Sequence, residues 1–251
     1  MFKIFKKKKV APVVQGIVPK HLAFICDGNR RWAKDRGLPP LEGHRSGITN
    51  FENFADWFMA HGVETLTFFI FSTENWDRSK DEVDFLMKLF YSELKKNLKN
   101  ATAKNIRYRV IGSRDRLPAK LAAMCDKLEA DSAENTGGTV VFALNYGGRD
   151  EIVRAVNTAI DSGATDLTIE TFESMMDTGD LTDIDMMVRT SGEHRISNFL
   201  LWKLAYAELL FIPQHWPQLV RSEKLWHEIL SEFARRNRRF GGGAEENYSG
   251  Q

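Results

Sequence analysis

An apolar run that ends in an acid, a glycine and two arginines constrains the fold of this chain more than any other segment. Residues 21–26 have the short apolar character of a buried strand, and residues 31–34 can open a helix after an Asp-Gly-Asn turn. The first N–H groups of a helix are unpaired and attract anions, and Gly28 allows the backbone to approach a ligand closely. The segment therefore predicts a strand, a tight turn and a helix around an oxyanion such as phosphate.

Two charged residues refine this prediction. Arg31 offers a bidentate guanidinium fork to a phosphate group. Asp27 would repel the same ligand unless a hard cation such as Mg²⁺ bridged the two groups. The sequence therefore indicates a complex of metal ion and phosphate, although an Asx-type turn before a capped surface helix explains the same residues on local evidence.

Strand and helix patterns alternate along the rest of the chain. Helices are predicted over residues 43–61, 81–104, 118–135, 149–160, 198–206 and 222–238, and strands over residues 63–71, 106–111, 139–145, 184–188 and 208–212. This order favours a single α/β domain with a mostly parallel central sheet covered by helices on both faces. In such sheets ligands bind at the carboxyl ends of the strands.

The composition restricts the class of protein. The chain has 251 residues, with 35 Lys and Arg against 34 Asp and Glu, so we expect no nucleic-acid partner. Two cysteines and the lack of a long apolar run predict a cytoplasmic protein. Residues 1–9 are strongly basic with interleaved apolar side chains, and this tail either makes peripheral contact with the inner face of a membrane or stays solvated.

Further polar clusters follow two later strands and open one helix. They contain hydroxyl, amide, indole, imidazole and guanidinium groups: Ser72, Asn75, Trp76, Arg78, Arg189, His194, Arg195, Ser197 and His44. Arg189, His194, Arg195 and Ser197 suit a second di-anion site, and Arg78 suits a second contact to an anion. The segment after residue 71 could also simply cap a helix, with Trp76 in the core. Glu208 lies in an apolar stretch, and a buried carboxylate there needs either a metal ion or an arginine as partner.

Taken together, the motifs resemble those of the cis-prenyltransferase family, the undecaprenyl diphosphate synthases and their relatives. The resemblance runs from residue 21 to residue 242 and rests on residues 27–33, 43–47, 71–78, 145–149, 189–199, 202–208 and 239–241. It implies a homodimer of α/β subunits, each with a parallel sheet flanked by helices and a hydrophobic tunnel. The implied reaction condenses isopentenyl diphosphate onto an allylic primer, usually farnesyl diphosphate, and gives a poly-cis product such as undecaprenyl diphosphate for the cell-wall carrier lipid.

The resemblance also implies roles for the matching residues. The catalytic positions would be Asp27, Ser72 and Asn75. The allylic diphosphate would be bound by Gly28, Asn29, Arg30, Arg31, Trp32, His44, Trp76 and Arg78. Isopentenyl diphosphate would be bound by Arg189, Arg195, Ser197, Arg239 and Gly241, and the motif 239–241 would reach into the site of the partner subunit. The Mg²⁺ ligands would be Asp27, Glu208 and His194.

One departure from the family pattern concerns charge. Many members have glycine at the position of Arg30 and arginine at the position of Pro40, and our hypothesis is that Arg30 compensates for the charge missing at Pro40. We expect residues 1–18 to form a flexible tail, residues 19–242 the catalytic domain and residues 243–251 a disordered tail. The alternative is a non-catalytic, polyprenyl-binding subunit or scaffold of the same fold.

Overall fold

The computed structural model describes residues 17–236, apart from the side chain of Thr102. Arg239, Gly241, the basic tail before residue 17 and the tail after residue 242 therefore lie outside the described residues. Within that range, no helix is both long enough and apolar enough to cross a membrane.

Six strands, nine α-helices and one short 3-10 helix make up the described part of the chain. They are β1 (His21–Ile25), α1 (Asn29–Lys34), α2 (Pro40–Ile48), α3 (Phe51–Ala60), β2 (Thr65–Ser72), η1 (Thr73–Asp77), α4 (Lys80–Lys104), β3 (Arg107–Ile111), α5 (Ala119–Ser132), β4 (Thr139–Tyr146), α6 (Gly148–Asp161), α7 (Ile169–Glu173), β5 (Met186–Arg189), β6 (Glu208–Phe211), α8 (Trp216–Leu219) and α9 (Glu223–Arg235).

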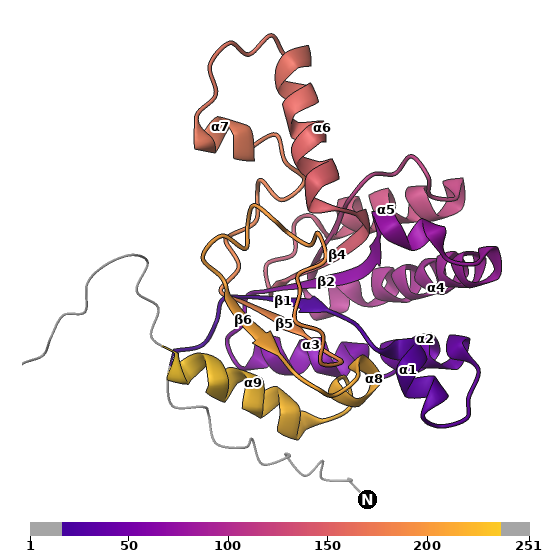
Figure 1. Ribbon diagram of the computed structural model, residues 1–251. Helices are drawn as coiled ribbons and strands as arrows, with labels where there is room; N and C mark the ends of the chain where they lie inside the picture. The colour runs from indigo at the N-terminus through magenta and orange to yellow at the C-terminus, as the bar shows by residue number, and fades with distance from the viewer. Residues whose placement is uncertain (1–16, 237–251) are drawn as a thin grey trace, which may run out of the picture.

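The strands form one sheet in the order β3-β4-β2-β1-β5-β6, and every neighbouring pair is parallel (Figure 1). Ile25 at the end of β1 is level with Phe69 of β2 and with Arg189 at the end of β5. The segments that follow these strands therefore meet at one edge of the sheet. The predicted single α/β domain with a parallel sheet is confirmed.

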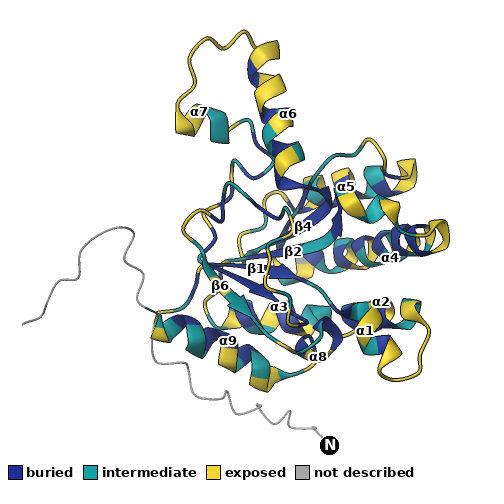
Figure 2. Ribbon diagram, viewed as in Figure 1, coloured by how far each residue is buried: buried dark blue, intermediate teal, exposed yellow. Residues whose placement is uncertain are grey.

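The two faces of the sheet are covered differently. Leu22 and Phe24 belong to a large core formed with α3, α4, α5, α8 and α9, whereas Ala23 and Ile25 belong to a smaller core on the opposite face. Figure 2 shows that the strands at the centre of the sheet are buried. That smaller core is closed largely by chain without regular structure, and the helix predicted over residues 198–206 does not form. Positive φ angles at Ser197, Asn198 and Leu200 explain this, because a right-handed helix requires negative φ.

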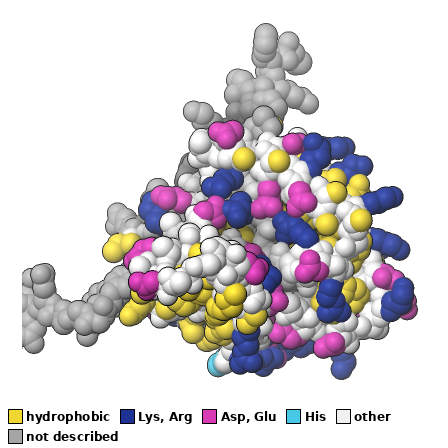
Figure 3. All heavy atoms as spheres, turned by 90° about the horizontal axis from the view of Figure 1, so that it is seen from above, with side chains coloured by type: hydrophobic (Ala, Val, Ile, Leu, Met, Phe, Trp, Pro, Cys, Tyr) yellow, Lys and Arg dark blue, Asp and Glu magenta, His cyan; other side chains and the backbone are white. Residues whose placement is uncertain are grey.

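Helices α6 and α7, with the segment between them, project from the body of the molecule (Figure 1). Apolar side chains along this arm are exposed: Val153, Val156, Ile160, Leu167 and Ile169. Figure 3 looks onto this side of the molecule, where hydrophobic side chains lie among groups of both charges. We call these five residues the apolar arm.

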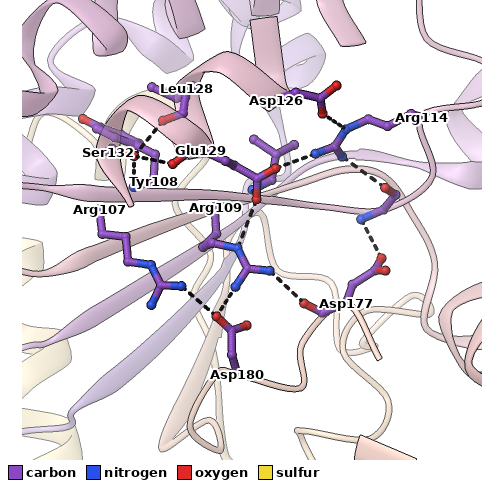
Figure 4. A network of polar contacts seen from close by, with 12 residues as sticks. Arg107, Tyr108, Arg109, Arg114, Asp126, Leu128, Glu129, Ser132, Asp177 and Asp180 are labelled. Atoms are coloured by element: carbon purple, nitrogen blue, oxygen red, sulfur yellow. Dashed lines mark hydrogen bonds and ion pairs between the residues drawn. The ribbon is translucent and has the colours of Figure 1, made fainter. Parts of the chain in front are cut away.

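A polar network ties the base of this arm to the edge of the sheet (Figure 4). Arg154 of α6 binds Asp177 at 2.7 Å, and Asp177 also accepts a hydrogen bond from the backbone N–H of Gly112 at 2.8 Å. Arg107 of β3 binds Asp180 at 2.9 Å. Because these ion pairs fix the chain on both sides of α7, the arm starts from an anchored base.

Candidate active site at the carboxyl edge of the sheet

The turn after β1 is held by contacts from two other segments. Asp27 Oδ1 accepts a hydrogen bond from the backbone N–H of Gly28 at 2.6 Å. The backbone carbonyl of Asp27 accepts hydrogen bonds from the N–H of Trp216 (3.0 Å) and from Thr190 Oγ1 (2.7 Å). Gly28 has a φ of +93°, and a Cβ atom there would lie 2.5 Å from Ser191 Oγ. The position therefore requires glycine both for its backbone angle and for space.

Arg189, the last residue of β5, links Asp27 to the loop that follows. Its Nη2 donates to Asp27 Oδ2 at 3.0 Å, and its Nη1 donates to Ser197 Oγ at 2.7 Å and to the backbone carbonyl of Arg195 at 2.5 Å. Arg31 approaches the same carboxylate, with Nη2 3.3 Å from Asp27 Oδ2. The Nε of Arg189 is buried and has no hydrogen-bond partner among the described residues. A buried guanidinium with a spare donor is suited to bind an anion.

A second cluster forms around Glu82 in the first turn of α4. Its Oε1 lies 2.9 Å from Arg78 Nη1 and 3.2 Å from His44 Nε2, and its Oε2 lies 3.3 Å from Arg30 Nη1. Glu82 is only 8% exposed, and the two arginines supply its charge compensation, while His44 lies within hydrogen-bonding distance of it. The cluster therefore fixes three nitrogen-bearing side chains around one point: Arg30 from α1, His44 from α2 and Arg78 from the link between η1 and α4.

The surroundings set the ionisation of both acids and of the histidine. Burial raises the pKa of Asp27, but the hydrogen bond from Arg189 and the charge of Arg189 outweigh it and lower the pKa overall. Burial likewise opposes ionisation of Glu82, and the charge of Arg78 contributes most to lowering its pKa overall. Burial and then the charge of Arg78 lower the pKa of His44. At neutral pH both carboxylates are therefore ionised and His44 is neutral.

These groups surround two adjoining cavities. The tunnel cavity, of about 600 Å³, is bounded mainly by apolar side chains of α2, α3, α4 and the sheet, namely Ile48, Phe51, Phe68, Leu86, Leu89, Phe90, Leu94 and Phe142. The polar cavity, of about 430 Å³, shares with it Cys26, Asp27, Asn29, His44 and Arg78. A charged cavity thus adjoins a mainly apolar one, in agreement with the hydrophobic tunnel that the family resemblance implies.

Most of the expected site residues in the described range line these cavities. The tunnel cavity includes Asp27, Asn29, His44, Ser72, Asn75, Arg78, Arg189 and Ser197, and the polar cavity adds Gly28, Arg30, Arg31 and Arg195. Asn75 Oδ1 also accepts a hydrogen bond from the backbone N–H of Ser72 at 3.2 Å, which fixes the turn between β2 and η1. The sheet register brings residues from distant parts of the chain together here.

The two tryptophans expected at the primer site line neither cavity. Trp76 donates its indole N–H to Asn145 Oδ1 at 2.7 Å, and the guanidinium of Arg116 lies 4.6 Å from its ring centroid. Trp32 is covered by Arg36, whose guanidinium lies 4.4 Å from the centroid of its ring. In this conformation both indoles therefore pack against protein groups.

The expected metal ligands are not brought together within one chain. Glu208 begins β6 and is level with Met186 at the start of β5, whereas Asp27 follows the carboxyl end of β1. Glu208 instead forms an ion pair with Arg236 at 2.8 Å. The ring of His194 stacks on Phe211 with centroids 5.1 Å apart. Among residues 17–236 no group of three His, Cys, Asp or Glu side chains is placed to hold a metal ion.

Three charged residues at this site received no role from the sequence. Glu82 centres the Arg78 cluster, Arg149 lines the tunnel cavity, and Glu193 accepts a hydrogen bond from Arg31 at 2.8 Å. For Glu82 the sequence did hold a signal, because Arg78 precedes it by four residues at the start of a helical pattern. The contact between Glu193 and Arg31 depends on strand register, which the sequence pattern leaves open.

Fold and site together define a class of protein. A parallel α/β sheet places anion-binding side chains at the mouth of an apolar tunnel, an arrangement suited to a ligand with an anionic head and a hydrophobic tail. Residues 25–241 match the family model described as "Putative undecaprenyl diphosphate synthase". The chain belongs to this family, and it is a prenyltransferase.

Relatives and solved structures agree with this assignment. An isoprenyl transferase of Neisseria meningitidis serogroup A is 43% identical over 229 residues, which covers 91% of this chain and 92% of that protein. The crystal structure of lavandulyl diphosphate synthase from Lavandula x intermedia in complex with dimethylallyl diphosphate matches with a TM-score of 0.84 and 34% identity, and covers 89% of this chain and 98% of that one. A structure titled as a probable undecaprenyl diphosphate synthase from Campylobacter jejuni matches with a TM-score of 0.76 and 33% identity, over 89% and 98% of the two chains.

Proposed function

We propose that this protein is a cis-prenyltransferase that condenses isopentenyl diphosphate onto farnesyl diphosphate, with undecaprenyl diphosphate as the product. The observation that carries this proposal is the junction of the polar and tunnel cavities at Asp27, His44 and Arg78. An allylic diphosphate bound at this junction would direct its hydrocarbon tail between α4 and the sheet. Membership of the family supports the same reaction class.

The two clusters divide the binding of two diphosphates. The cluster of Arg30, His44 and Arg78 around Glu82 is assigned to the primer, together with backbone and side-chain donors of Gly28, Asn29 and Arg31. The cluster of Arg189, Arg195 and Ser197 is assigned to isopentenyl diphosphate. Both sets of donors are held in place before a ligand arrives, which reduces the cost of ordering them.

In the reaction, the C1–O bond of the primer breaks while C4 of isopentenyl diphosphate forms a bond to C1. Loss of a proton from the new unit then gives the cis double bond. The arginines stabilise the charge that develops on the leaving diphosphate, and the apolar tunnel excludes water from the allylic centre. Ser72 and Asn75 line the tunnel cavity next to this centre, where they would position the reacting carbons.

Asp27 is suited to be a carboxylate ligand of Mg²⁺, which in proteins commonly binds one or two carboxylates together with phosphate oxygens and water. It is ionised, it lines both cavities, and guanidinium groups that suit diphosphate oxygens lie within 3.3 Å of its Oδ2. Bound Mg²⁺ would supply charge stabilisation for the leaving diphosphate. Within one chain Glu208 and His194 do not join Asp27, so substrate oxygens are the more suitable further ligands.

A homodimer is also part of the proposal. The apolar arm exposes five large hydrophobic residues on one projecting unit, and a second copy of the chain would cover them. In that assembly the motif 239–241, with Arg239 and Gly241, is assigned to the isopentenyl diphosphate site of the partner subunit. The basic residues before residue 10 would make peripheral contact with an anionic membrane, where the product is released.

The test is incubation of the purified protein with farnesyl diphosphate, radiolabelled isopentenyl diphosphate and Mg²⁺, followed by chromatographic sizing of the products. We expect a ladder of polyprenyl diphosphates that depends on metal and is absent in the Asp27→Ala variant. No product from farnesyl diphosphate or from shorter and longer allylic primers would contradict the proposal and favour the non-catalytic polyprenyl-binding subunit.

A further inference from the structure

Asn198, which has no role in the reaction proposed above, joins three segments that leave the carboxyl edge of the sheet. It lies in the loop after β5, one residue beyond Ser197. Its Nδ2 donates to Glu74 Oε1 in η1 at 3.0 Å. Its Oδ1 accepts a hydrogen bond from the backbone N–H of Arg149 at 2.9 Å, and its backbone carbonyl accepts one from the N–H of Gly148 at 2.7 Å. Both ends of the side-chain amide are therefore engaged, each with a segment that follows a different strand.

The surroundings of Asn198 leave it little freedom to move. A backbone N–H can only donate and an ionised carboxylate can only accept, so its two side-chain contacts permit one orientation of the amide. Its φ of +62° is left-handed, which asparagine tolerates better than most residues. The next residue, Phe199, is fully buried and stacks on Phe69 of β2 with ring centroids 4.5 Å apart. A Cβ atom at Gly147 would lie 2.7 Å both from Asn198 Nδ2 and from Thr73 Oγ1, so the three segments meet without space for another side chain.

The segments that Asn198 joins carry groups of the proposed reaction. Ser197, the residue before it, belongs to the cluster assigned to isopentenyl diphosphate. Glu74 lies between Ser72 and Asn75 in the turn after β2. All five side chains line the tunnel cavity. A displacement of Asn198 from Glu74 would therefore move the isopentenyl diphosphate donors away from the groups that position the reacting carbons.

Glu74 is an ionised partner for this amide. Burial raises the pKa of the Glu74 carboxyl, but hydrogen bonds, above all the one from Asn198, lower it overall. A hydrogen bond to a charged acceptor is stronger than one between neutral groups. Among residues 17–236 no cation forms an ion pair with Glu74, so Asn198 is the main partner of this acid within the described range.

We propose that Asn198 is a positioning residue that, by holding Glu74, keeps the isopentenyl diphosphate donors in register with the turn after β2. This inference rests on the proposed prenyl transfer and adds a residue that acts through its neighbours. It predicts that loosening the contact weakens the binding of isopentenyl diphosphate. The primer should bind as before, because Arg30, His44 and Arg78 are held by Glu82.

The test uses variants that separate geometry from charge. Asn198→Asp removes the donor and opposes Glu74 with a second carboxylate, while an oxygen can still accept from the N–H of Arg149. Glu74→Ala removes the acceptor together with a negative charge, and the loss of charge alone would strengthen diphosphate binding. The double variant Asn198→Asp/Glu74→Gln exchanges donor and acceptor and so restores the hydrogen bond. Asn100→Asp is the matched control, because Asn100 Nδ2 donates to Glu52 Oε1 at 3.4 Å and neither residue lines a cavity.

Steady-state kinetics with farnesyl diphosphate as primer measure kcat and the KM for isopentenyl diphosphate. We expect Asn198→Asp and Glu74→Ala each to raise this KM about tenfold with kcat changed less than about threefold, because one charge-assisted hydrogen bond is lost. The double variant should return to within about threefold of the unchanged protein, and Asn100→Asp should not differ from it. The Kd of farnesyl diphosphate, measured by calorimetry without isopentenyl diphosphate, should stay within about twofold in every variant.

The outcomes decide the inference separately from the proposed function. A KM that falls or stays unchanged in Glu74→Ala overturns the inference, and so does a double variant that is no better than Asn198→Asp. Glu74 is exposed, so its replacement gives an answer even if Asn198→Asp fails to fold. If the unchanged protein binds isopentenyl diphosphate in a calorimetric titration but makes no product, the proposed function fails. The Kd of isopentenyl diphosphate for the same variants then still decides the role of Asn198.

Discussion

Replacing Gly28 by alanine tests whether the turn after β1 is as tightly fitted as its geometry indicates. A Cβ atom at this position would lie 2.5 Å from Ser191 Oγ and 2.6 Å from His215 Nδ1, in a backbone with φ of +93°. Gly37 is the matched control: its φ is +66°, and no other atom lies within 4 Å of a Cβ built there. Both substitutions impose left-handed strain, but only the one at Gly28 adds a steric clash.

The expected magnitudes follow from these contacts. Left-handed backbone costs an alanine about 1 to 2 kcal/mol, which is the whole effect expected for Gly37→Ala. At Gly28 the new methyl group must also separate Ser191 from His215, whose 2.6 Å hydrogen bond is worth about 1 kcal/mol. Forcing the packed neighbours apart adds about 1 to 3 kcal/mol. Gly28→Ala should therefore lower the free energy of unfolding by about 3 to 6 kcal/mol.

Urea unfolding monitored by tryptophan fluorescence measures both variants under the same conditions. A shift of the midpoint at constant slope reports the change in stability. If Gly28→Ala is as stable as Gly37→Ala to within about 0.5 kcal/mol, the turn can relax and the steric argument fails. Prenyl transfer gives an independent check, because displacement of Gly28 also disturbs its hydrogen bond to Asp27. We expect activity to fall in Gly28→Ala and to persist in Gly37→Ala.

Three further predictions concern charge. Burial lowers the pKa of His21 from 6.5 to about 4, so the unfolded chain binds more protons than the folded chain between these pH values. The free energy of unfolding should therefore be highest above about pH 6.5 and should fall by about 2 kcal/mol at pH 5. Urea titrations of His21→Gln should lack this loss. Asp27→Asn keeps the size of the side chain but removes its charge, and turnover at saturating Mg²⁺ should drop at least about 100-fold. The urea midpoint should also fall, because the buried Arg189 loses its charged partner, so turnover is compared in the absence of urea, where the variant is folded. Near-normal turnover would exclude Asp27 as a metal ligand. Arg30→Gly should weaken primer affinity about tenfold if Arg30 supplies the charge missing at Pro40, and unchanged affinity in a calorimetric titration would refute that hypothesis.

The sequence predicted the parts of this structure that depend on local pattern. The strand before Asp27 and the long helix α4 were recognisable because the spacing of apolar residues and the turn residues are local features of the sequence. The predicted helix over residues 198–206 was wrong because left-handed backbone at Ser197 and Asn198 is imposed by surrounding contacts, including the hydrogen bond from Arg189 to Ser197. These positive φ angles could not be predicted from the residue types, because neither Ser197 nor Asn198 is glycine.

Long-range register explains why the expected metal ligands Asp27, Glu208 and His194 do not meet within one chain. Glu208 was predicted to begin a strand, and in a parallel sheet the first residue of a strand lies away from the carboxyl edge that carries Asp27. The spacing therefore already argued against a shared ion within one chain. The Glu82 cluster is the opposite case, because the helical spacing to Arg78 was readable but the approach of Arg30 and His44 depends on how α1 and α2 pack.

The carboxylates of the site explain how several arginine side chains can lie close together before a ligand binds. Five arginines that line the two cavities pair with three carboxylates: Arg30 and Arg78 with Glu82, Arg31 with Asp27 and Glu193, Arg189 with Asp27, and Arg195 with Glu193. These ion pairs fix the guanidinium groups and limit their mutual repulsion. The surplus of arginines over carboxylates leaves positive charge for a diphosphate, so ligand binding can extend an existing network at little ordering cost. Because several of these pairs are partly exposed, added salt should weaken diphosphate binding more than it weakens the fold, whose core is apolar.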